Sequence, residues 1–122
     1  MTGNVTTDDF CDVCEEFNLE FFTLSEDYMM HPKNIKLSEI FGCIAVYNTQ
    51  TKTMCVSNGI RVIWMQNNKT RETTFSHLEF QSFNTYVNVN EAKKQIQQVL
   101  KDYKDIKVKL KMKEIEKDFK ND

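Results

Sequence analysis

The chain has 122 residues, enough for one ordinary domain with one core. Its 40% hydrophobic and 28% charged residues are typical of a globular protein and exclude an intrinsically disordered one. The net charge of −2 argues against a basic nucleic-acid-binding domain, and no apolar run approaches the roughly 20 residues that span a bilayer.

The compartment and source follow from residue usage. The N-terminus lacks the basic segment of a secretory signal, so we expect a cytoplasmic protein whose four cysteines are reduced. Lysine outnumbers arginine and asparagine is frequent, which is typical of AT-rich genomes such as those of many phages and mobile elements. We expect one domain over residues 1–122.

An amphipathic helix is predicted over residues 7–17. Thr6 and Asp9 have the spacing of a capping box, and acidic residues occupy the first turn, where the helix dipole favours them. Apolar side chains then recur at helical spacing, at Phe10, Val13, Cys14, Phe17 and Phe21. Residues 18–24 fit either a continuation of the helix or a strand.

The central stretch, residues 41–75, predicts an antiparallel β-meander. Three short runs rich in β-branched and aromatic residues cover 43–47, 53–57 and 60–65. Residues 48–52 fit a hairpin loop, and Asn58-Gly59 predicts a tight type I′ turn because both residues tolerate positive φ. Asn67-Asn68-Lys69 predicts another turn, and a fourth strand is expected over 70–75, returning beside the third. Residues 76–89 fit an edge strand or a short helix. The sheet should therefore have three to five strands.

A long helix is predicted over residues 90–119. Apolar residues from Ala92 to Tyr103 follow a helical rhythm. Residues 106–113 alternate between apolar residues and lysine, which is strand periodicity, but no Gly or Pro interrupts them and we favour one continuous helix. Such a helix would be about 45 Å long, so its distal half should project from a small domain. The predicted class is α+β.

Candidate sites for chemistry are few. Cys11 and Cys14 form a CxxC pair that could hold one side of a zinc ion, but no second CxxC completes a tetrahedral site. His77 lies near Ser76 and Glu79, yet sequence neighbours rarely converge as a catalytic triad. The lysines of the C-terminal helix are interleaved with acids and lack arginine, which argues against nucleic-acid binding. We therefore expect no enzymatic activity, no cofactor and no resident metal.

The expected function is that of an interaction or structural subunit with a protein partner, self or other. The apolar stripe of the C-terminal helix extends beyond the predicted domain, which is consistent with a homo-oligomer. The partner-binding residues predicted on that stripe are Ile106, Leu110, Met112, Ile115 and Phe119.

Residues 1–40 carry nine acids and two lysines, so the alternative is an inhibitor or regulator that occupies a basic site on its partner. The acids of that surface are Asp8, Asp9, Asp12, Glu15, Glu16 and Glu20.

Overall fold

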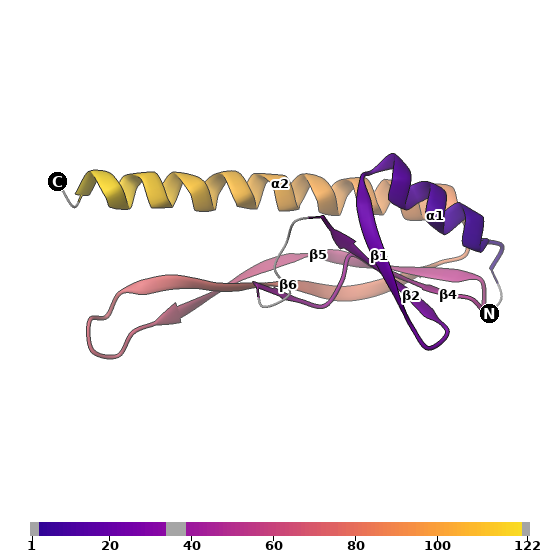
Figure 1. Cartoon of the computed structure of the whole chain (residues 1–122), viewed down its shortest axis with the longest axis horizontal. Coiled ribbons are helices and arrows are strands. Elements are labelled where there is room, and N and C mark those ends of the chain that lie inside the picture. The colour runs from indigo at the N-terminus through magenta and orange to yellow at the C-terminus, as the bar shows by residue number, and fades with distance from the viewer. Residues whose placement is uncertain (1–2, 34–38, 121–122) are drawn as a thin grey trace.

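The computed structural model describes residues 3–33 and 39–120, with the backbone alone described for Leu24 and residues 114–120. Figure 1 shows a twisted sheet with a short helix, α1 (Thr7–Glu16), near one end and a long helix, α2 (Val89–Lys120), along its length. The strand pairs are mostly antiparallel, which confirms the predicted α+β class. No helix within the described ranges is both long and apolar enough to cross a bilayer.

Both ends of α1 lie at residues that favour a helix terminus. Thr6 and Asp9 form the predicted capping box, in which each side chain accepts a hydrogen bond of 3.0 Å from the other residue's backbone N–H. Asn18 adopts a left-handed conformation with φ of 55°, which ends the helix. The buried side chains of α1 are Phe10, Val13 and Cys14. The N-terminal helix is therefore confirmed, one residue shorter than predicted.

The described residues form a sheet of six strands in the spatial order β1-β2-β4-β5-β6-β3, more than the three to five expected. The strands are β1 (Leu19–Leu24), β2 (Asp27–Pro32), β3 (Ile40–Phe41), β4 (Ala45–Asn48), β5 (Thr53–Gln66) and β6 (Thr73–Tyr86). β1 and β2 form a hairpin, so residues 19–24 are a strand rather than a continuation of the helix. The short β3 pairs with β6 in parallel.

The prediction of a tight turn at Asn58-Gly59 is wrong. Both residues lie inside β5, which runs unbroken for 14 residues beside the equally long β6. The turn of this hairpin lies between Asn67 and Glu72, where Asn67 N donates to Glu72 O at 2.9 Å, so the second predicted turn, at Asn67-Asn68-Lys69, is confirmed. An Asn-Gly pair permits a turn but does not require one, and pairing along the whole of β6 satisfies more backbone groups. Residues 73–86 are accordingly one strand.

α2 packs against this hairpin, chiefly against β5. Ala92, Ile96 and Val99 are fully buried in the core that α2 shares with the central strands. Residues 106–113 belong to the same helix, as favoured from the sequence, despite their strand-like alternation. A helix keeps Ile106 and Leu110 on the side that carries Val99, whereas a strand would require a neighbouring strand to pair with.

Candidate protein-binding surface

The strongest candidate surface lies on an arm that extends away from α1. We define the arm as residues 60–80 of the β5–β6 hairpin together with α2 from Tyr103 onward. Figure 1 shows the hairpin and the C-terminal half of α2 extending side by side in the same direction. α2 contacts β5 far more extensively than it contacts β6. The sequence had suggested that the distal half of α2 projects from the domain by itself. In the structure, the hairpin extends beside it.

The inner side of α2 is occupied by the chain's own hairpin. Ile106 and Leu110 are half-buried on the helical face that continues from Val99. One turn further on, the Lys113 ammonium lies 4.4 Å from the centroid of the Trp64 ring. This cation–π contact shows which side of the helix faces β5. The apolar stripe through Ile106 and Leu110 thus has an intrachain partner.

The outer side of α2 carries a second apolar stripe. Val108 is 53% exposed and Met112 is 58% exposed, one helical turn apart. Because each residue turns the helix by about 100°, Val108 lies about 200° around the axis from Ile106. Val108 and Met112 therefore point away from the hairpin. Exposed apolar side chains on one helical face are typical of a surface that binds a partner.

The predicted partner-binding residues thus divide between two faces. Ile106 and Leu110 lie on the inner face, and Met112 lies on the outer face with Val108. Ile115 and Phe119 belong to α2, but their side chains lie outside the described part of the chain. Val108 was missing from the predicted set, although its spacing of four residues from Met112 was a signal for it.

The tip of the arm adds apolar surface that was not among the predicted partner-binding residues. Trp64 is 39% exposed, and its ring meets Phe75 edge-on at 6.3 Å between centroids. Met65, on the next position of β5, is 60% exposed. The sequence placed Trp64 and Met65 in a strand of the central meander, because the predicted turn at Asn58-Gly59 folded β5 back on itself, and not at the tip of an extended arm.

The predicted acidic surface is only partly continuous. Asp8, Asp12 and Glu15 are exposed and lie on one side of α1 at helical spacing. Glu16 instead pairs with Lys93 of α2 at 2.6 Å. The two others have separate settings: Asp9 completes the capping box, and Glu20 lies on β1 opposite His31.

Cys14 of the CxxC pair lies in a setting that opposes thiolate chemistry. Cys14 is 3% exposed, and burial, with a smaller contribution from Cys11, raises the pKa of its thiol to about 12. Burial likewise raises the pKa of Cys43 to about 11, with Cys55 as the second cause. A thiol held protonated is a poor nucleophile and a poor zinc ligand. Among the described residues, no group of three or more His, Cys, Asp or Glu side chains could hold a metal ion.

This setting predicts a two-class pattern of thiol reactivity. In the native protein at about pH 8, Cys11 and Cys55 should react with iodoacetamide well before Cys14 and Cys43, because only an accessible thiolate is alkylated. Peptide mass mapping after a short pulse measures the four sites separately. In urea all four should react alike. Native labelling of Cys14 as fast as that of Cys11 would contradict the burial described here.

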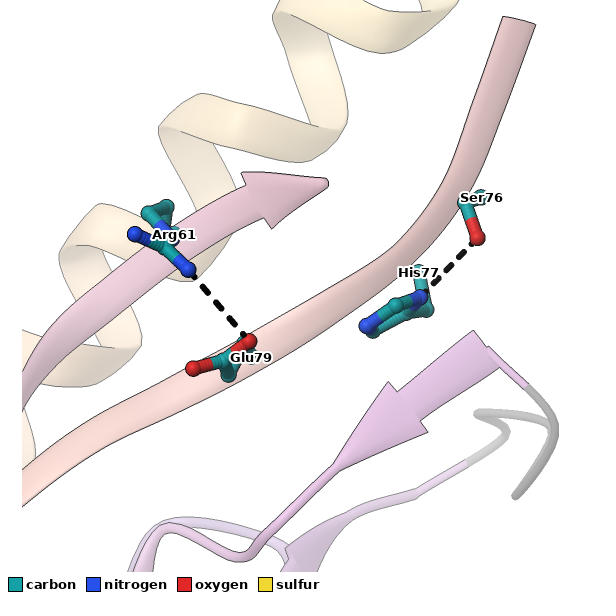
Figure 2. A network of polar contacts seen from close by, with 4 residues as sticks. All are labelled: Arg61, Ser76, His77 and Glu79. Carbon is teal, nitrogen blue, oxygen red and sulfur yellow. Dashed lines mark hydrogen bonds and ion pairs between the residues drawn. The ribbon is translucent and has the colours of Figure 1, made fainter. Parts of the chain in front are cut away.

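The residues around His77 form two separate pairs rather than a triad. Figure 2 shows Ser76, His77 and Glu79 on β6 and Arg61 on the neighbouring β5. Ser76 Oγ lies 2.9 Å from His77 Nδ1, whereas Glu79 pairs with Arg61 across the strands at 3.6 Å. Of the contacts within the described residues, none joins Glu79 to His77. The structure therefore brings the predicted Ser76 and His77 together without the carboxylate that would orient the imidazole.

Comparisons with protein-family models, with curated protein sequences and with solved structures found no match to this chain. A function for this protein must therefore be inferred from its own residues. Of the surfaces described above, the outer face of α2 combines exposure, apolar character and helical order most clearly.

Proposed function

We propose that the protein is a non-enzymatic interaction subunit that binds a protein partner through the outer face of the C-terminal half of α2. The observation that supports this proposal is the exposure of Val108 and Met112 on the side of α2 opposite its own hairpin. Because the inner face already packs on β5, a partner can bind the outer face without disturbing the fold. An apolar stripe on an ordered helix suits recognition by another helix or by a groove.

Site-specific photo-crosslinking in the cells that make the protein tests this proposal. A benzophenone amino acid would replace Met112 in the full-length chain, and the matched control would place it at Gln97, an exposed residue on the same side of α2. Adducts are separated by gel and identified by mass spectrometry. We expect a discrete protein adduct from position 112 and little from position 97. Equal adducts from both positions, or none from either, would overturn the proposal.

A second candidate function is the inhibitor or regulator that presents an acidic surface to a basic partner. The observation that favours it is the exposed acidic row formed by Asp8, Asp12 and Glu15. Charge complementarity of this kind accelerates association and makes it sensitive to salt. The same crosslinking experiment separates the two functions when the benzophenone is placed at Asp12. A salt-sensitive adduct from position 12 with none from position 112 would favour this second function.

A further inference from the structure

The outer apolar stripe of α2 has the spacing of a coiled-coil seam. Val108 and Met112 are four residues apart, and the sequence continues the pattern with Ile115 and Phe119, spaced by three and then four residues. The backbone of α2 is helical through all of these positions. This 4-3-4 rhythm is the heptad pattern by which two helices pack together. The two preceding seam positions are Lys101 and Asp105, so the apolar seam begins at Val108.

The charges beside the seam are unevenly distributed along it. Lys109 and Lys111 occupy the flanking positions of its first half, and Glu116 and Asp118 occupy those of its second half. When two identical helices pack antiparallel, the first half of each seam lies against the second half of the other. Every flanking lysine is then opposite a flanking acid, which favours both register and orientation.

A parallel arrangement of the same seams satisfies these charges less well. In a parallel pair, the residue just before seam position 105 or 112 faces the residue five positions later on the other copy. Lys111 would then face Glu116, but Lys104 would face Lys109 of the other copy. Like charges held at such positions are destabilising. The sequence beside the seam therefore selects the antiparallel arrangement.

From these observations we infer that the occupant of the outer face of α2 is a second copy of this chain, bound antiparallel about a two-fold axis between Met112 and Ile115. This inference rests on the proposed function and names its partner. In the dimer, position 108 of α2 is level with position 119 of the other copy, and position 112 is level with position 115. Each α2 is then layered between its own hairpin and the other α2. α1 packs near the N-terminal part of α2 and stays clear of the contact.

The oligomeric state of the full-length protein tests the inference. Sedimentation equilibrium over a range of micromolar concentrations should show a monomer–dimer equilibrium. Met112→Lys places a charge in the seam and should weaken the dimer about tenfold or more. The matched control, Gln97→Lys, adds the same charge outside the seam and should leave the dimer unchanged. Because both residues are exposed, both variants should keep the wild-type circular dichroism, which shows that the monomer stays folded.

Charge reversal tests the role of the flanking residues. Lys109→Glu with Lys111→Glu should abolish the homodimer, because both halves of the seam become acidic. Glu116→Lys with Asp118→Lys should do the same by making both halves basic. Mixing the two variants should restore a dimer that contains one copy of each. A mixture that stays monomeric would overturn the assigned charge pairing.

Orientation is tested by a disulfide. A variant with Val108→Cys and Phe119→Cys, oxidised and mapped by mass spectrometry, should link position 108 of one copy to position 119 of the other. A link between the two 108 positions would overturn the antiparallel arrangement. A protein that is monomeric at every concentration would overturn self-association altogether. If crosslinking from position 112 then captures a different protein, the proposed function stands while the inference of a second copy fails.

Discussion

Replacing Phe10 with alanine should lower the free energy of unfolding by about 3–5 kcal/mol, the range measured for large aromatic side chains removed from protein cores. Phe10 is fully buried, and its ring stacks on Tyr47 with 5.7 Å between centroids. It also meets Phe21 and Tyr28 edge-on, at 5.4 and 5.7 Å. The lost stability has two causes. The apolar area of the ring is no longer buried, and a cavity is left among aromatic rings that belong to the strands of the sheet. Urea denaturation followed by circular dichroism measures the change.

Phe41→Ala provides the matched control for this experiment. The Phe41 side chain is 67% exposed on the short edge strand β3, so its removal leaves no buried cavity. We expect its cost to stay within about 0.5 kcal/mol. If Phe10→Ala lowered the free energy of unfolding no more than Phe41→Ala does, the conclusion that Phe10 anchors α1 on the sheet would be wrong.

His31 should make the stability of the protein depend on pH. The residue is 4% exposed and its ring stacks on Phe22, with 4.6 Å between centroids. Neither ring nitrogen has a hydrogen-bond partner among the described residues. Burial therefore lowers the pKa of His31 below its ordinary value of 6.5, and the opposing effect of Glu20, its cross-strand neighbour, is smaller.

The direction of the pH effect follows from this lowered pKa. Above about pH 6.5 the imidazole is neutral in both the folded and the unfolded state, and the stability is complete. As the pH falls below that value, the unfolded state takes up a proton that the folded state resists. The free energy of unfolding should then fall by at most about 1.4 kcal/mol per pH unit until the folded pKa is reached. Urea denaturation in steps from neutral pH to about pH 5 measures this slope.

Two variants test whether His31 causes that slope. His31→Phe keeps a planar ring beside Phe22 but cannot take up a proton, so it should flatten the slope. His77→Gln removes the other histidine and should keep the slope, because it leaves His31 in place. A slope that survives in His31→Phe and disappears in His77→Gln would contradict the assignment.

Several elements could be predicted because their signals lie within a few residues of one another. The Thr6–Asp9 capping box and the apolar stripe from Phe10 define α1 without reference to the rest of the chain. The polar segment 48–52 likewise became the loop between β4 and β5, where Asn48 Oδ1 accepts hydrogen bonds from the backbone N–H groups of Gln50 and Thr51.

The candidate surface was predicted less well than the fold. The sequence identified the C-terminal half of α2 as apolar, but its two stripes could not be assigned to different neighbours. The β5–β6 hairpin distinguishes them, because Ile106 and Leu110 are half-buried on the side of α2 that faces β5, whereas Val108 and Met112 are exposed. The turn at Asn67-Asn68-Lys69 and the strand that returns from it were predicted, but the full length of the hairpin was missed because Asn58-Gly59 carries a strong local turn signal that pairing with β6 overrides.

By itself, the sequence determined the α+β class, the position of α1, the loop between β4 and β5, and the continuity of α2. These features follow from capping residues and from periodicity within single segments. Only the tertiary structure decided the extended path of Asn58-Gly59, the length of the hairpin and the side of α2 that it covers. Each of these depends on contacts between residues far apart in the chain, as between Trp64 and Lys113, and no local pattern encodes such contacts.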